Sequence, residues 1–369
     1  MAVAKSPPII APAQRSLEEL AATLSAWLPT RMLGAQDVRI SDVQYPRGAG
    51  MSHETILFQA QWREDGMERE RGLVVRIKPG ANKQVYVDDM FVEQFKLMQA
   101  ARASGKVKVA ETLWLEEDPG LLGAPFFVME RMNGRVPVSY PPYTTEGWFF
   151  DATPAQRRKA WEGGLRQLAS IQLIPRDTVQ FLDFGEGRLS GFEQELDRYR
   201  RLMGRILKPG PLPFHERAFE EIVRTAPKNW PEGIVWGDAR IGNIMFDEAF
   251  EVVGVMDWEQ PSLGGALHDL AWWLYNEDVM TSGKGVGRPD GMGSPEEARA
   301  IWSEVTGIPV SDMDWYLTFA AFKGETLRIH MIDGGWFKSA PGMDYADSHG
   351  TRFIAEKLGW ESPKPQPTR

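Results

Sequence analysis

The sequence contains no cysteine, few histidines and no long apolar run. Without cysteine, its 369 residues form no disulfide, no thiolate metal site and no cysteine nucleophile, so any catalysis would rest on carboxylates, hydroxyls, histidine or a bound metal. The five histidines include no H-x-x-x-H pair, which argues against a zinc site. No stretch reaches the roughly 18 apolar residues of a membrane span, and the start of the chain has too short an apolar stretch for a signal peptide. We therefore expect a cytoplasmic protein without a membrane partner.

The negative charge is unevenly distributed along the chain. The net charge is −9, of which residues 1–131 carry −1 and the remainder −8. An acidic balance argues against nucleic acid as a partner and would favour a cationic acceptor through long-range steering. The hydrophobic content of 43% over 369 residues suffices for two lobes, each with its own core.

The residue pattern divides the chain into four parts. Residues 1–37 are interpreted as an N-terminal extension, disordered at first and then helical from Leu17 to Leu28, with Ser16 as its N-cap. Residues 38–133 predict a small lobe of antiparallel strands with one helix, and residues 134–360 a mainly helical lobe. The Pro-rich residues 361–369 predict a flexible tail.

The expected elements can be stated by range. In the small lobe we expect a helix at 87–103 and strands at 38–43, 55–62, 73–77, 112–115 and 126–130. In the large lobe we expect helices at 154–171, 192–206, 215–225, 267–275, 295–305 and 312–332. No internal repeat is visible.

Residues 236–243, W-G-D-A-R-I-G-N, and residues 257–259, D-W-E, are the most informative segments. Two apolar runs separated by an acidic turn lie between them, which predicts a β-hairpin. Antiparallel pairing about that turn places Asn243 and Asp257 at the same end of the hairpin. An amide oxygen and a carboxylate side by side are hard ligands of the kind that Mg²⁺ takes. Asp238 would then stand beside the metal.

This combination resembles the protein-kinase-like fold, and within it the aminoglycoside phosphotransferase and choline kinase group. The pattern of that group is H-G-D-x-x-x-x-N followed by an Asp on the next hairpin. The similarity extends from about Val38 to Trp273, and it is greatest to bacterial phosphotransferases with W-G-D-x-R-x-G-N and D-W-E segments, which are related to kinase domains attached to some acyl-CoA dehydrogenases. It implies an α+β two-lobe fold and an ATP- and Mg²⁺-dependent kinase that acts on a hydroxyl of a small molecule.

The resemblance also implies roles for individual residues. Asp238 would be the base that orients and deprotonates the acceptor hydroxyl, and Arg240 would place a cation against the γ-phosphate. Asn243 and Asp257 would hold Mg²⁺. Asp269 matches a structural aspartate that ties the catalytic loop to the helix beneath it.

At the nucleotide end, the loop with Gly48, Gly50 and Ser52 lies where a kinase-like fold covers the phosphates. The third strand offers two cations on one face, Arg76 and Lys78, for the α- and β-phosphates. The family pattern points to Arg76, and Lys78 stays as the second choice.

Three further predictions complete the nucleotide site. Glu93 is the expected helix carboxylate that pairs with the phosphate-binding cation. Met129, Glu130 and Arg131 belong to the segment that links the lobes, where backbone groups would bind adenine. The residues leave the choice between ATP and GTP open, and also the oligomeric state.

The acceptor is the least determined part. Eleven of the 14 tryptophans follow residue 131 and could present an aromatic wall, and Glu325, Arg328 and His330 are candidate contacts on a late helix. Core packing is the alternative role and is expected for most of these tryptophans, which include Trp258, Trp272, Trp273, Trp315 and Trp336. A hydroxyacyl-CoA or another hydrophobic alcohol would suit the aromatic content, whereas an aminoglycoside would suit the acidic lobe.

The rival functional class is an inactive pseudokinase that acts as a binding module. It is favoured by Trp236 in place of the usual His and by Arg76 in place of the usual Lys.

Overall fold

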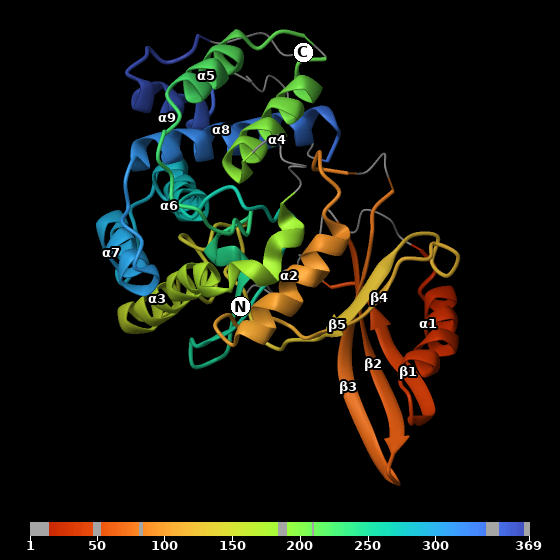
Figure 1. Cartoon of the computed structure of the whole chain (residues 1–369). Coiled ribbons are helices and arrows are strands. Elements are labelled where there is room, and N and C mark those ends of the chain that lie inside the picture. The colour runs from red at the N-terminus through yellow and green to blue at the C-terminus, as the bar shows by residue number, and fades with distance from the viewer. Residues whose placement is uncertain are drawn as a thin grey trace. The chain divides into compact units, whose positions relative to one another are not determined.

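The chain has the mixed α+β architecture that its sequence predicted (Figure 1). The structure is a computed structural model that describes residues 15–46, 53–80, 84–183, 190–208, 210–336 and 347–364. The chain forms two compact units, the first made of residues 1–85 and 110–132 and the second of residues 86–109 and 133–369. In the described part of the chain, no helix is long and apolar enough to cross a membrane.

The first unit is built on a five-stranded antiparallel sheet in the order β1-β2-β3-β5-β4. All five strands were predicted, but β2 and β3 are longer than expected. Asp65 and Gly66 both adopt positive φ, which forms the two-residue turn that joins β2 to β3. The pairing therefore continues through the charged residues beside the turn. The strands are β1 (Gln36–Gln44), β2 (Glu54–Glu64), β3 (Met67–Ile77), β4 (Thr112–Glu116) and β5 (Phe126–Glu130).

Helix α1 (Leu17–Arg31) belongs to the core of this unit. Ser16 caps it as predicted, with its hydroxyl accepting from Glu19 N at 3.3 Å. Its buried face packs on the sheet, where the Trp27 and Phe126 ring centroids are 4.9 Å apart. The interpretation of residues 1–37 as an extension therefore misses a contribution of α1 to the hydrophobic core, because the sequence does not show which surface an amphipathic helix covers.

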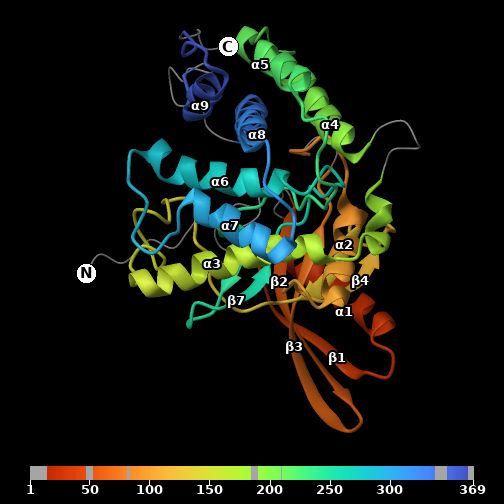
Figure 2. The same cartoon turned by 60° about the vertical axis from the view of Figure 1, so that its left-hand side comes forward.

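The second unit contains α2 and the larger set of helices (Figure 2). Helix α8 packs against α4, α5, α6 and α9, and it is the central helix of this layer. The sequence predicted α2 to α8 and missed α9. The helices are α2 (Phe91–Ser104), α3 (Pro154–Ser170), α4 (Gly191–Ile206), α5 (Pro213–Arg224), α6 (His268–Met280), α7 (Pro295–Thr306), α8 (Met313–Asp333) and α9 (His349–Leu358), with short 3₁₀ turns at 171–173, 176–182, 241–243 and 282–284.

Residues 86–109, which include α2, group with the second unit and not with the sheet. The sequence had assigned them to the small lobe of residues 38–133. One contact of α2 within the second unit is the Lys96 ammonium over the Phe181 ring, 5.7 Å from its centroid. The segment that leads into α2 is bound to α4 by ion pairs, which are described below.

We predict that α1 contributes directly to the stability of the first unit. Leu24 is 1% exposed in the core, so Leu24→Ala should lower the free energy of unfolding by about 2–5 kcal/mol through lost burial and a cavity. Leu33 lies just beyond the helix and is 90% exposed, so Leu33→Ala serves as the matched control, within about 0.5 kcal/mol of wild type. Chemical denaturation measures both, and equal effects would contradict the packing of α1.

Candidate active site

The predicted hairpin is present and brings Asn243 and Asp257 to one end. Strands β6 (Ile244–Phe246) and β7 (Val252–Val255) pair antiparallel, with Ile244 opposite Val255. Beyond that pair, Met256 N donates to Asn243 O at 2.9 Å. Asp257 follows with φ of 63°, a left-handed conformation that turns the chain out of the strand.

Asp238 is surrounded by hydrogen-bond donors. Its Oδ2 accepts from Arg240 Nε at 2.9 Å and from Asn243 Nδ2 at 2.7 Å, and its Oδ1 accepts from Trp272 Nε1 at 2.9 Å. Burial alone would raise the pKa of Asp238, but the Arg240 guanidinium and these N–H donors lower it below its usual value. The carboxylate is therefore ionised at neutral pH and fixed in orientation.

Arg240 forms an ion pair with the predicted base. Besides Asp238, its guanidinium donates from Nη1 to Ser139 Oγ at 3.0 Å. Its side chain keeps 29% exposure. The predicted contact of Arg240 with a γ-phosphate remains a prediction, and the structure adds that Arg240 orients and stabilises the charge of Asp238.

Asn243 and Asp257 offer oxygen ligands of the type that Mg²⁺ takes. The Asn243 amide nitrogen donates to the backbone and side-chain oxygens of Asp238. These two bonds fix the orientation of the amide group, and its oxygen is the atom that could bind a metal. Within the described ranges there is no group of three or more acidic or histidine side chains that could hold a metal. Two protein ligands suit an ion that keeps water and phosphate in most of its shell.

The backbone that precedes Asp238 is held by Asp269, as predicted. One oxygen of the Asp269 carboxylate accepts from Trp236 N and the other from Gly237 N, the latter at 3.0 Å. Asp269 lies in the first turn of α6 and is 1% exposed. Gly237 has φ of +104°, and a Cβ there would lie 2.3 Å from Gln260 O, so only glycine fits.

Lys323 on α8 is a site residue that the sequence analysis missed. Its ammonium donates to Gly237 O and lies 4.5 Å from the centroid of the Trp272 ring, whose N–H binds Asp238. Burial lowers the pKa of Lys323, whereas the charges of Glu195, Asp269 and Asp238 act in the opposite direction. The sequence feature that could have identified Lys323 is its position directly after the apolar run Ala320-Ala321-Phe322, which suggests a buried lysine.

Trp236 replaces the usual His of this motif with a different contact. Its indole Nε1 donates to Met256 O and Asp257 O, both at 3.0 Å. The side chain is buried at 0% exposure and lies beside Trp258, with ring centroids 5.8 Å apart. The tryptophan therefore connects the Asp238 loop to the backbone of Asp257, so its presence does not indicate a decayed site.

The cations expected at the nucleotide end lie in the first unit. Arg76 is on β3, 9% exposed, with Nη2 3.2 Å from His53 Nδ1. Lys78 follows directly after β3, and its backbone N donates to Pro125 O at 2.9 Å. Gly48, Gly50 and Ser52 lie outside the described residues.

The remaining nucleotide candidates fall in both units. Met129 and Glu130 end strand β5, and Arg131 N donates to Gly72 O at 2.9 Å. Glu93 lies in the first turn of α2, within the second unit.

The acceptor candidates are mostly engaged within the protein. Glu325 is 4% exposed and accepts from Arg328 Nε at 2.8 Å, and the His330 ring lies 5.4 Å from that of Trp336. Trp258 and Trp273 are fully buried, which removes them from the expected aromatic wall. Trp315 stacks between core aromatics, with ring centroids at 5.3 and 5.5 Å, and Trp272 donates to the Asp238 carboxylate.

Comparison with known proteins places this geometry in context. The model of the "Phosphotransferase enzyme family" matches residues 46–298. The chain is 25% identical over 336 residues to "Probable acyl-CoA dehydrogenase IBR3" of Arabidopsis thaliana, covering 85% of this chain and 39% of that protein. It is 24% identical over 321 residues to human "Acyl-CoA dehydrogenase family member 11", covering 81% of this chain and 39% of that protein. The chain thus spans about two fifths of the length of these relatives.

Solved structures show the same fold. A Ralstonia eutropha JMP134 protein provisionally named an aminoglycoside phosphotransferase is 21% identical, with a TM-score of 0.66 and coverage of 91% of this chain and 95% of that one. The streptomycin–ATP–APH(2″)-IIa ternary complex is 13% identical, with a TM-score of 0.53 and coverage of 88% and 94%.

We predict that Asp269 makes stability depend on pH. Burial raises the pKa of Asp269 to about 6 in the folded protein, above its ordinary 3.8, even though two backbone N–H groups donate to it. The folded state therefore binds this proton more tightly than the unfolded state, and the free energy of unfolding falls as pH rises from about 4 to about 6. Relative to Asp269→Asn, which does not titrate, the wild-type value should fall by roughly 3 kcal/mol across this window. If the unfolding free energy of wild type relative to Asp269→Asn stays constant or rises with pH, the raised pKa of Asp269 is wrong.

Proposed function

Since the chain belongs to the phosphotransferase enzyme family, we propose that it transfers the γ-phosphoryl group of ATP to a hydroxyl of a small molecule, with Mg²⁺. The observation that carries the proposal is the placement of three side chains. Asp238, Asn243 and Asp257 lie together at the end of the β6–β7 hairpin, with Asp238 ionised and held by three donors. An orienting carboxylate beside two oxygen ligands is the arrangement that phosphoryl transfer requires.

Asp238 would act on the acceptor. Its carboxylate accepts a hydrogen bond from the attacking hydroxyl, orients that oxygen, and takes the proton as the bond to phosphorus forms and the bond to ADP breaks. A lowered pKa makes Asp238 a weak base, so we assign it mainly an orienting role, with proton transfer late in the reaction. Arg240 would donate from its guanidinium to the transferred phosphoryl group and stabilise its charge.

Asn243 and Asp257 would hold Mg²⁺, which when bound supplies positive charge to the phosphate oxygens. Arg76 or Lys78 would bind the α- and β-phosphates, together with backbone groups around Gly48, Gly50 and Ser52. Backbone groups of Met129 to Arg131 would bind the base of the nucleotide. Glu93 is kept as a further candidate of the nucleotide site.

For the acceptor we propose a hydroxyacyl-CoA or another hydrophobic alcohol. The named relatives across more than 80% of the chain are acyl-CoA dehydrogenase family proteins, at 24–25% identity. An aminoglycoside is the second candidate, supported by the shared fold with the streptomycin–ATP complex at 13% identity. An inactive binding module is disfavoured, because all three site residues are retained and Trp236 has a structural role at the site.

Two substitutions should separate chemistry from nucleotide binding. Asp238→Asn keeps the size of the side chain but removes its charge, so turnover should fall by about 100-fold or more while ATP·Mg²⁺ affinity stays within about threefold. Asp257→Asn should weaken the part of ATP binding that depends on Mg²⁺. Calorimetric titration with and without Mg²⁺ measures binding, and product analysis with hydroxyacyl-CoAs and aminoglycosides measures transfer.

Glu248→Gln is the matched control, because Glu248 is an exposed acid in the turn of the same hairpin. Its binding and turnover should equal those of wild type. Turnover of Asp238→Asn within about threefold of wild type would show that Asp238 is not the base.

A further inference from the structure

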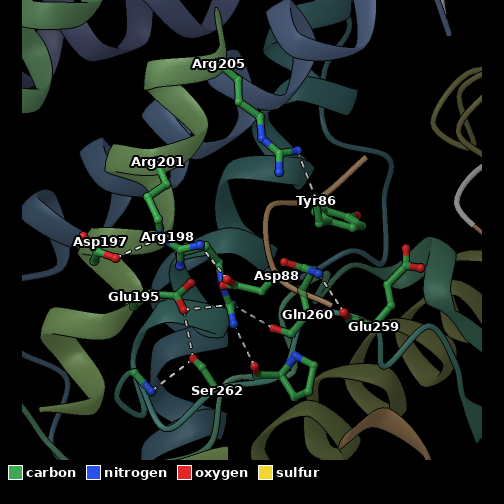
Figure 3. A network of polar contacts seen from close by, with 12 residues as sticks. Tyr86, Asp88, Glu195, Asp197, Arg198, Arg201, Arg205, Glu259, Gln260 and Ser262 are labelled. Atoms are coloured by element: carbon green, nitrogen blue, oxygen red, sulfur yellow. Dashed lines mark hydrogen bonds and ion pairs between the residues drawn. The ribbon is translucent and has the colours of Figure 1, made fainter. Parts of the chain in front are cut away.

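Tyr86 lies just before α2, in a segment that Arg198 connects to the loop after Asp257. Among the residues that the structure describes, the Tyr86 hydroxyl has no hydrogen-bond partner, and the side chain is half-buried. Burial, followed by the charges of Glu259, Asp238 and Asp257, raises the pKa of Tyr86 well above its ordinary value. Tyr86 is therefore a neutral hydrogen-bond donor at neutral pH. In Figure 3 its ring extends toward the side where Glu259 lies.

Three arginines on one face of α4 hold this segment, one through its backbone and two through the Asp88 side chain. Arg198, Arg201 and Arg205 are spaced at i, i+3 and i+7, which places them on one side of the helix. Arg205 Nη1 donates to Tyr86 O at 3.3 Å. The Asp88 carboxylate accepts from Arg198 Nε at 2.8 Å and from Arg201 Nη1 at 2.7 Å (Figure 3). The segment is therefore fixed both at Tyr86, through its carbonyl, and at Asp88, through its side chain.

Arg198 connects this segment to the loop that follows Asp257. Its guanidinium donates to Gln260 O at 3.2 Å and to Pro261 O at 3.0 Å. It also pairs with Glu195 Oε2 at 3.1 Å, and the same oxygen accepts from Ser262 Oγ at 2.9 Å. The Gln260 carbonyl in turn lies against Gly237, next to Asp238. One buried guanidinium thus connects the segment of Tyr86 and Asp88 to the loop after Asp257, which in turn lies against Gly237.

The ion pair between Arg198 and Glu195 is buried, which indicates that its role is to fix the geometry of this region. Arg198 and Glu195 have side chains only 4% and 1% exposed. Removing both charges from water costs much of what their attraction gains, so well-packed apolar residues would stabilise the fold as well. What the ionic arrangement adds is a fixed direction for each of its hydrogen bonds.

Resting on the proposed function, we propose that Tyr86 is a catalytic residue whose hydroxyl donates a hydrogen bond to the γ-phosphate of ATP, and that Asp88 and Arg198 are its positioning residues. The γ-phosphate would carry its charge into a region that already contains three carboxylates. A neutral hydroxyl can donate to it without adding a further ion pair. Such a contact is made by ATP and not by ADP.

The test compares ATP and ADP by calorimetric titration of the full chain in the presence of Mg²⁺. Tyr86→Phe should weaken ATP binding by roughly tenfold, the loss expected for one hydrogen bond to a charged group, and leave ADP binding within about twofold. Asp88→Asn should weaken ATP binding several-fold and leave ADP binding unchanged, because the segment loses its ion pairs with Arg198 and Arg201. A merely structural role of Asp88 would lower both affinities together.

Two controls match these variants. Tyr316→Phe removes a buried hydroxyl far along the sequence on α8, and Asp314→Asn removes an exposed acid that pairs with Lys357, outside the Tyr86 segment and its arginines. Both should bind ATP and ADP like wild type.

The outcomes separate the two levels of the proposal. Wild-type binding of both nucleotides with no loss of ATP affinity in Tyr86→Phe would overturn the contact while the proposed function stands. Equal losses for ATP and ADP would overturn the assignment to the γ-phosphate. Wild-type protein that binds neither nucleotide would overturn the proposed function and this inference with it.

Discussion

The two hydrogen bonds from the backbone of Trp236 and Gly237 to Asp269 are the interaction on which the site depends. They fix the turn immediately before Asp238, and the Lys323 ammonium fixes the next peptide through the Gly237 carbonyl. A residue with a side chain would not fit at Gly237. Because the peptides on both sides of Gly237 are held from α6 and α8, these helices set the direction in which Asp238 leaves the backbone.

Charge balance is the second constraint on the second unit. Carboxylates gather around the loops that carry Asp238 and Asp257, and cations or N–H donors offset several of them. Arg240 and the Trp272 indole keep Asp238 ionised, and Arg198 offsets Glu195 and Asp88. Burial still dominates at Asp269, which explains why its pKa is raised while that of Asp238 is lowered.

Local features could be predicted from the sequence, and long-range packing could not. The hairpin follows from two apolar runs around an acidic turn, so Asn243 and Asp257 were correctly placed together, and the role of Asp269 followed from the family resemblance. Lys323 reaches the backbone beside Asp238 from α8, and Arg198 connects the segment before α2 to the loop after Asp257. No spacing rule covers such distances in sequence. The same limit explains why α1 was taken for an extension and why the sequence could not distinguish tryptophans of an acceptor wall from those of the core.

A crystal structure of the protein with Mn²⁺ and a non-hydrolysable ATP analogue would test the central claim most directly. Mn²⁺ replaces Mg²⁺ and is located by its anomalous signal. The account predicts one metal peak within about 2.0–2.3 Å of the Asn243 amide oxygen and the Asp257 carboxylate, with Asp238 outside the metal shell and facing the γ-phosphate. A nucleotide bound without metal at these two residues, or metal bound elsewhere in the chain, would contradict it.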